Sequence, residues 1–227
     1  MFEKDLKLFS EEIYLKYLTT SNFNPDYPNW LNNKKINKYL EARHFVHTQE
    51  SCKKFIENCI SSSDNILFGI FLIENNEHIG NIKVGPIDFI NKHAEIGIII
   101  GNKNYWGKKI ATRAIICTTK FAIEDLGLKS LNCSAYESNI GSIKAFKKAG
   151  YIISGSIPNR WKTSIDNYES DILLNFTNSK INIPNSGDVI LYGGGEILEF
   201  CYKFLSTKID SKYIHIITSE RLKNSFS

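Results

Sequence analysis

The chain has 227 residues, enough for one well-buried domain and part of a second, and too few for two complete enzyme domains. Apolar residues make up 42% of it and charged residues 23%, a balance that excludes a wholly disordered chain. The net charge is +4 and the lysine pairs are scattered, so we expect no nucleic-acid partner.

Cysteine and histidine spacing argues against disulfide and metal frameworks. The five cysteines form no C-x-x-C pair, which fits reduced thiols packed as small apolar residues in a cytoplasmic protein. His44 and His47 have no third ligand at a recognisable spacing, so we expect no metal. The N-terminus resembles neither a signal peptide nor a membrane span, so we expect no membrane partner.

The first third of the chain mixes regular and irregular patterns. Residues 6–10 alternate and predict an edge strand, after which Ser10 is expected to cap a helix with an apolar stripe of Ile13, Leu15 and Leu18. Residues 22–33 are rich in Asn, Pro and aromatic side chains and predict a loop. Thr48 is expected to cap an amphipathic helix over residues 49–62.

The centre of the chain predicts an antiparallel meander. Dense apolar strands are expected over 66–73 and 78–84, joined by a polar tetrad suited to a hairpin turn. A third strand is expected over 94–100. Its continuous apolar end, residues 98–100, predicts burial on both faces.

Helices and strands then alternate. We expect helices over 107–126 and 139–149, each closed by a glycine, and strands over 131–136, 151–157 and 168–176. This order predicts an α/β fold of the α+β type, with a mixed, mostly antiparallel sheet of about seven strands and helices on both faces. We assign it to residues 1–176, followed by a linker over 177–187 and a partial Rossmann-like β-α-β unit over 188–227.

One segment has the form of a phosphate site. Residues 104–112 lie between the third strand and a helix start, where first-turn N–H groups without internal partners and the helix dipole favour an anion. Gly107 supplies the turn. An ordinary strand-to-helix loop has the same form, so this segment alone does not establish a cofactor site.

Two motifs together resemble the GNAT superfamily of N-acetyltransferases, in its ribosomal-protein and amino-sugar acetyltransferase branch. Asn104, Gly107 and Lys109 stand where that family has Gln/Arg-x-x-Gly-x-Gly/Ala, with two of the three positions altered. Residues 137–151 match its pattern Glu/Asn-x-Asn-x-x-(Ala/Ser)-x-x-x-(Tyr/Phe)-x-x-x-Gly-(Phe/Tyr). The resemblance spans about residues 6–176. It implies the GNAT fold, with acetyl-CoA as the acetyl donor.

The resemblance also implies where acetyl-CoA binds. The strand over 94–100 is expected to splay from the strand over 131–136, so that the pantetheine arm pairs with main-chain groups of Ile98 and Ile100. A backbone N–H near Gly97 or Ile98 would polarise the thioester. The further cofactor contacts are expected at Trp106, Gly107, Lys108, Lys109, Ile110, Ala111, Thr112, Asn139 and Phe146. Asn139 is a cofactor contact, a helix N-cap, or both.

The chemistry needs an amine that has lost its proton and a thiolate that leaves. Glu95 is the candidate base, directly or through water. The usual acid of the family is a tyrosine, which Phe146 replaces here; Ser142 and Tyr136 are the nearest substitutes, unless the thiolate takes its proton from water.

The acceptor is expected to be a small-molecule amine, and a nucleotide-linked amino sugar in particular. Tyr27, Trp30, Arg160 and Trp161 offer rings for stacking and a cation for phosphate. Residues 189–198 and 216–221 also resemble the start of a nucleotide-sugar formyltransferase domain that lacks its catalytic residues. The alternatives are acetylation of protein N-termini and a non-catalytic acetyl-CoA-binding module.

Overall fold

The computed structural model describes four stretches of the chain, which divides into two compact units, residues 1–178 and 179–227. The described residues are 6–164, 167–177, 189–193 and 214–218. Each unit is described by itself.

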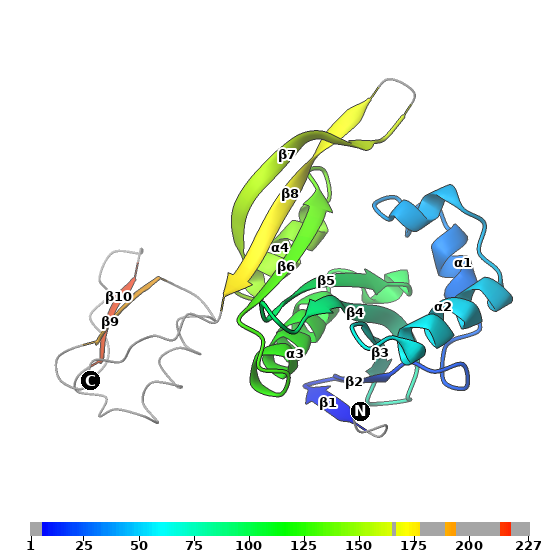
Figure 1. Cartoon of the computed structure of the whole chain (residues 1–227), viewed down its shortest axis with the longest axis horizontal. Coiled ribbons are helices and arrows are strands. Elements are labelled where there is room, and N and C mark those ends of the chain that lie inside the picture. The colour runs from blue at the N-terminus through cyan, green and yellow to red at the C-terminus, as the bar shows by residue number, and fades with distance from the viewer. Residues whose placement is uncertain (1–5, 165–166, 178–188, 194–213, 219–227) are drawn as a thin grey trace. The chain divides into compact units, whose positions relative to one another are not determined.

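The first unit is built on an eight-stranded sheet in the order β1-β2-β3-β4-β5-β6-β8-β7 (Figure 1). Only the β5–β6 pair is parallel, so the sheet is mixed and mostly antiparallel, as the pattern of elements predicted. Its strands are β1 Lys7–Ser10, β2 Ile13–Tyr17, β3 Ile66–Leu72, β4 His78–Asp88, β5 His93–Ile100, β6 Ser130–Tyr136, β7 Ile152–Lys162 and β8 Tyr168–Thr177.

The additional strand is β2, and the helix expected after Ser10 is wrong. Residues 13–17 pair antiparallel with both β1 and β3. Ile13 and Leu15 are fully buried, two residues apart on one face of the strand. The stripe of Ile13, Leu15 and Leu18 contains this period of two, which a strand uses and a helix does not.

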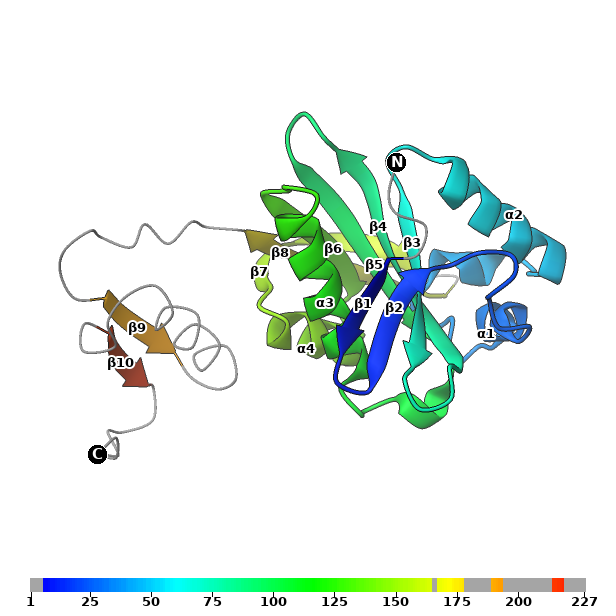
Figure 2. The same ribbon diagram turned by 90° about the horizontal axis from the view of Figure 1, so that it is seen from below.

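Helices cover both faces of the sheet (Figures 1 and 2). α3 (Ile110–Glu124) and α4 (Ile140–Lys148) lie on one face, and α1 (Tyr27–Asn32) and α2 (Gln49–Ser61) on the other. Two 3-10 turns, η1 (Glu41–His44) and η2 (Lys103–Tyr105), complete the unit. The predicted loop over 22–33 therefore contains a short helix, which Pro28 starts at its first turn.

Local capping confirms the start of α2. The Thr48 side chain accepts a hydrogen bond from the Ser51 backbone N–H at 3.1 Å. The Ser51 hydroxyl accepts one from the Thr48 N–H at 2.9 Å. This reciprocal capping box satisfies two N–H groups that the first helical turn leaves unpaired.

The two faces of the sheet have separate cores. The larger one packs α3 and α4 onto the sheet around residues such as Phe68, Ile82, Ile115, Leu131 and Phe146. The smaller one joins α1 and α2 to the opposite face through Tyr14, Trp30, Ile56 and Phe71, among others. The four described cysteines are free thiols, three of them buried. Burial raises the pKa of Cys117 to about 11, which keeps it a neutral thiol.

In the second unit the structure describes β9 (Val189–Gly193) and β10 (Ile214–Thr218), which pair in parallel. This is the pairing expected of the two strands of a β-α-β unit. The predicted helix over 196–205 lies outside the described residues.

Candidate active site

The first unit contains an opening between two parallel strands. β5 and β6 share three register pairs, His93–Ser130, Ala94–Leu131 and Glu95–Asn132, and none beyond them. In Figure 1, β6 turns away from β5 after this point. The edge of β5 from Ile96 onward therefore has backbone groups with no strand partner on the β6 side, as the splayed-strand expectation requires.

This splay also corrects the expected burial of residues 98–100. Ile98, Ile99 and Ile100 are half-buried, because the neighbour that would have covered them has diverged. Ile98 and Ile100 pack against the larger core and Ile99 against the smaller.

A groove of about 480 Å³ occupies the opening. It brings together nine of the residues expected at the cofactor site, namely Ile98, Ile100, Trp106, Gly107, Lys109, Ile110, Ala111, Thr112 and Asn139, and the candidate acid Ser142. Lys35, Lys109, Lys144 and Lys148 give the groove a positive wall, and none of its described lining residues is acidic. The groove is thus suited to a long polyanionic ligand.

The loop before α3 has two left-handed residues. Gly107 has φ +76°, and Lys109, the N-cap of α3, has φ +62°. Glycine adopts this conformation without cost, whereas lysine is strained in it. The predicted helix start moves from Gly107 to Ile110, so the free N–H groups of the first turn of α3 lie beside the groove. A Cβ added at Gly107 would meet no protein atom within 4 Å.

Two expected cofactor residues lie outside the groove lining. Lys108 is exposed and its Nζ lies 5.4 Å from the centroid of the Tyr105 ring. Phe146 is 2% exposed and packs edge-on against Tyr151 in the larger core, with 5.0 Å between ring centroids. Its predicted cofactor contact is therefore corrected to core packing, since the buried face of α4 carries it.

Asn139 caps α4 and lines the groove as well. Its Oδ1 accepts a hydrogen bond from the Ser142 backbone N–H at 3.3 Å. Both roles left open by the sequence are thus available to it at once.

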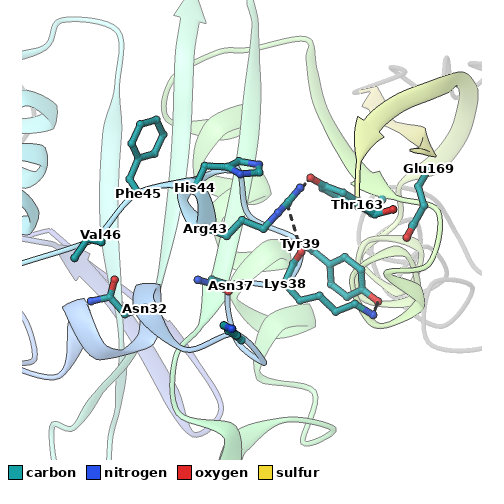
Figure 3. A pocket seen from close by; sticks show the side chains of 12 residues that line it. Asn32, Asn37, Lys38, Tyr39, Arg43, His44, Phe45, Val46, Thr163 and Glu169 are labelled. Carbon is teal, nitrogen blue, oxygen red and sulfur yellow. Dashed lines mark hydrogen bonds between the residues drawn. The ribbon is translucent and has the colours of Figure 1, made fainter. Parts of the chain in front are cut away.

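A second pocket, of about 660 Å³, lies beside the groove. Figure 3 shows side chains of the segment 32–46 facing Thr163 and Glu169. Its lining comprises Asn32, Lys34, Asn37, Lys38, Tyr39, Arg43, His44, Phe45, Val46, Tyr136, Thr163 and Glu169. Among the described residues, Tyr39 alone lines both this pocket and the groove.

Tyr136 is fixed within the second pocket by a charged pair. Its hydroxyl donates to Glu41 Oε1 and accepts from Arg43 Nη1 at 2.5 Å. Arg43 and Glu41 form an ion pair at 3.2 Å, and Arg43 Nη2 donates to the Lys162 carbonyl at 2.9 Å. Burial, together with the bond to Glu41, raises the pKa of Tyr136 to about 12, so it remains a neutral phenol.

The Tyr39 hydroxyl has a different environment. It donates to the Ser138 carbonyl at 3.1 Å and lies 3.0 Å from Lys38 Nζ and 3.2 Å from Ser138 Oγ. The hydrogen bond from Ser138, followed by that from Lys38, lowers the pKa of Tyr39. Hydrogen bonds that favour the charged form make the phenol a stronger acid.

Glu95 stands at the vertex of the splay, as the last paired residue of β5. Its side chain is exposed and lines neither the groove nor the second pocket. Ala94 and Ile96 point into the larger core, so alternation places Glu95 on the opposite face, the one that α1 and α2 cover.

The residues expected to bind the acceptor are not gathered. Tyr27 and Trp30 are 4% and 6% exposed, in edge contact with 5.8 Å between ring centroids, inside the smaller core. Their predicted substrate contact is corrected to core packing, because no ring face stays open. Trp161 stacks on Tyr136 at 5.1 Å, and Arg160 lies over Trp161 at 5.5 Å. Neither Arg160 nor Trp161 lines the second pocket, although Tyr136, on which Trp161 stacks, does.

Sequence reasoning missed most of the second pocket. Lys38, Tyr39 and Arg43 belong to a polar, Asn- and Lys-rich stretch with no periodicity, and Glu169 lies on a strand more than a hundred residues away. No local signal marks them, since only tertiary packing joins these segments.

No group of three or more His, Cys, Asp or Glu within the described residues could hold a metal ion. Within the same residues, no helix has both the length and the apolar composition to cross a membrane.

Comparison with known proteins gives matches to acetyltransferases. A sequence profile described as "Acetyltransferase (GNAT) domain" matches residues 13–152. The uncharacterized protein MJ1062 of Methanocaldococcus jannaschii is 30% identical over 112 residues, which is 47% of this chain and only 22% of that protein.

Two solved structures share the fold. The ribosomal L7/L12 alpha-N-protein acetyltransferase RimL, in complex with coenzyme A, superposes with a TM-score of 0.67 at 16% identity, over 76% of this chain and 98% of RimL. The spermidine N-acetyltransferase of Vibrio cholerae, in complex with CoA and spermine, gives 0.65 at 18% identity, over 75% and 98%. The profile match ends at residue 152, and the resemblance of the tail to a formyltransferase gains no support from these matches.

Proposed function

The chain belongs to the GNAT acetyltransferase family, and from this membership we propose that it transfers the acetyl group of acetyl-CoA to the amine of a nucleotide-linked amino sugar in the cytoplasm. The observation that carries the acceptor class is the positive lining of the second pocket. The free cysteines among the described residues support the cytoplasmic setting.

The groove fits acetyl-CoA, which supplies an acyl group activated as a thioester. Its phosphates would be received by the groove lysines and by the free N–H groups at the start of α3. An extended arm would pair with the open edge of β5 at Ile98 and Ile100, as a further strand does. Gly107 leaves room for close approach, since no protein atom occupies the space beside it.

The second pocket supports an anionic acceptor. Lys34, Lys38, Arg43 and His44 line it, against Glu169 as the one acidic residue of the described lining. The ion pair with Glu41 offsets the charge of Arg43, so the two lysines dominate the potential. A phosphate-bearing sugar is attracted by such a lining, whereas a polycation such as spermidine is repelled. The Glu169 carboxylate offers a partner for the ammonium form of the acceptor.

The acceptor must lose a proton before its nitrogen attacks the thioester. Glu95, at the vertex, is the proposed base, acting directly or through water. A backbone N–H near Gly97 or Ile98 is the proposed donor to the thioester oxygen. Ser142, which lines the groove from the first turn of α4, is one of the two nearby substitutes for the missing family tyrosine, the other being Tyr136.

The test is acetyl transfer by the purified protein, measured as thiol release. Acceptors would be nucleotide-linked amino sugars, the same sugars without phosphate, spermidine and N-terminal peptides. We expect turnover to favour the phosphate-bearing sugars. Brisk acetylation of peptides or spermidine, with no nucleotide-linked sugar used, would refute the acceptor class, and no transfer to any amine would favour a non-catalytic module.

A charge variant sharpens the test of the pocket. Lys34→Gln should raise KM for the nucleotide-linked sugar about fivefold at low salt, and less at high salt, because a single exposed charge contributes on the order of 1 kcal/mol. Lys120→Gln, on the exposed side of α3 and paired with Glu124, is the matched control. Equal KM values for the two variants would refute phosphate recognition at Lys34.

A further inference from the structure

We propose that Tyr39 is the catalytic acid that protonates the departing sulfur in acetyl transfer, an assignment that rests on the function proposed above. The family position for this acid holds Phe146, whose ring is buried and has no hydroxyl. The structure places a different phenol, from the segment between α1 and α2, at the required place.

The position of Tyr39 carries the argument. The thioester approaches along the groove and the amine through the second pocket, so the C–N bond forms where the two spaces meet. Tyr39 is the one described residue that lines both. The residue at this junction is the one within reach of both the bond that forms and the bond that breaks.

The surroundings of the Tyr39 hydroxyl suit proton donation. Lys38 Nζ, at 3.0 Å, and Ser138 Oγ, at 3.2 Å, both point hydrogen-bond donors at the oxygen. These donors stabilise the phenolate that remains after the proton leaves. They lower the pKa of Tyr39, which makes its hydroxyl a stronger acid than an ordinary phenol. A stronger acid gives its proton to a departing thiolate more readily, as general acid catalysis requires.

Two further titratable groups face Tyr39, and one of them acts against these donors. The Glu169 carboxylate raises the pKa of Tyr39, although less than Ser138 and Lys38 lower it. The Tyr136 ring lies 5.6 Å from the Tyr39 ring, and its own hydroxyl is bonded to Glu41 and Arg43. Tyr136 is therefore a poor donor itself, since its pKa is raised to about 12.

Ser142 is the remaining competitor. It also lines the groove, but an aliphatic hydroxyl is a far weaker acid than a phenol. In addition, Ser142 does not line the second pocket, so it lies away from the junction of the two spaces. The junction thus favours Tyr39.

The step balances without any further reactant. The amine nitrogen attacks the carbonyl carbon and forms the C–N bond, while its proton passes to water, which can relay it to Glu95. The C–S bond breaks and sulfur keeps the electron pair. The Tyr39 hydroxyl gives its proton to sulfur, and solvent returns a proton to the phenolate. The products are the amide and the free thiol.

The test is Tyr39→Phe, which removes one oxygen and keeps the ring. At neutral pH we expect kcat to fall about 100-fold, with acetyl-CoA affinity unchanged by calorimetry. The alkaline limb of the kcat–pH profile, where Tyr39 loses its proton, should disappear. Tyr168→Phe, an exposed phenol of β8 that lines neither space, is the matched control and should keep both kcat and the profile.

A second readout needs no turnover. An ultraviolet pH titration of the free protein should show one phenol ionising below the ordinary range, absent in Tyr39→Phe and shifted upward in Lys38→Met. Ser138→Ala should shift it in the same direction. These two variants also keep the proposal testable where Tyr39→Phe does not fold.

Two outcomes would overturn the assignment. One is a Tyr39→Phe enzyme with wild-type kcat and an intact alkaline limb. The other is an ordinary phenol titration in the wild type, unchanged by Lys38→Met. If the wild-type enzyme is active, either result overturns the role of Tyr39 but leaves the proposed function standing. A wild-type protein that acetylates no amine would overturn both the proposed function and the role of Tyr39.

Discussion

Gly101→Ala should destabilise the smaller core and the pocket segment attached to it. Gly101 follows β5, and a Cβ there would lie 1.9 Å from Trp30 Cδ2, 2.1 Å from Cε3 and 2.5 Å from Cε2. Trp30 cannot yield easily, because its ring contacts Tyr27 at 5.8 Å and His78 at 5.2 Å. Overpacking of a well-packed core costs about 2 kcal/mol. For a domain of this size, that cost lowers Tm by roughly 4 to 8 °C.

The assay is thermal unfolding followed by circular dichroism, with Gly97→Ala as the matched control. Gly97 also belongs to β5, but a Cβ there would meet nothing within 4 Å, so we expect no loss of stability. Because Trp30 belongs to α1, which leads into the segment 32–46, KM for the acceptor should rise in Gly101→Ala more than KM for acetyl-CoA. A Tm for Gly101→Ala equal to that of Gly97→Ala would refute the packing argument.

Three further variants test the donor site, the base and the core. Gly107→Val should sharply weaken acetyl-CoA binding, because the left-handed backbone disfavours a branched side chain and the side chain would fill the open space beside the loop. Unchanged affinity by calorimetry, in a folded variant, would refute the cradle. Glu95→Gln should lower kcat about 100- to 10,000-fold, most strongly below the pKa of the amine, with little effect on acetyl-CoA affinity. Wild-type turnover at pH 7 would assign the base elsewhere. Burial lowers the pKa of His78 to about 4 from 6.5, so the unfolded chain binds the proton first as pH falls. The free energy of unfolding should therefore fall by about 3 kcal/mol between pH 6.5 and 4, as measured by urea unfolding. The fall should be smaller in His78→Gln. An equal fall in that variant would contradict the assignment to His78.

Much of the fold was predictable because local patterns coincide with tertiary placement. The capping box at Thr48 satisfies N–H groups within one helical turn, so its signal needs no distant partner. The strands of the meander follow one another in the chain and pair in that order. The residues from 13 to 18 misled because Leu15 and Leu18 have helical spacing while Ile13 and Leu15 have strand spacing, and only the pairing with β1 and β3 decides between them.

The donor side of the site was predictable for the same reason. Its residues come from a strand, the loop after it and the start of the next helix, so one continuous stretch places Ile98, Gly107 and Thr112 along one groove. Phe146 is the exception, since nothing in its motif shows that its ring turns inward to Tyr151.

Sequence by itself determined the family, the order of most elements and the stretch that lines the groove, because short-range motifs encode all three. Only the tertiary structure decided which residues form the second pocket and which phenol stands at its junction with the groove. Tyr39 and Ser138 are 99 positions apart in the chain, yet a hydrogen bond joins them and Tyr39 lines both spaces. Such contacts leave no periodic trace, since they depend on how α1, its following segment and the β6–β8 edge pack in three dimensions. The same packing takes Tyr27 and Trp30 out of the site and into the core.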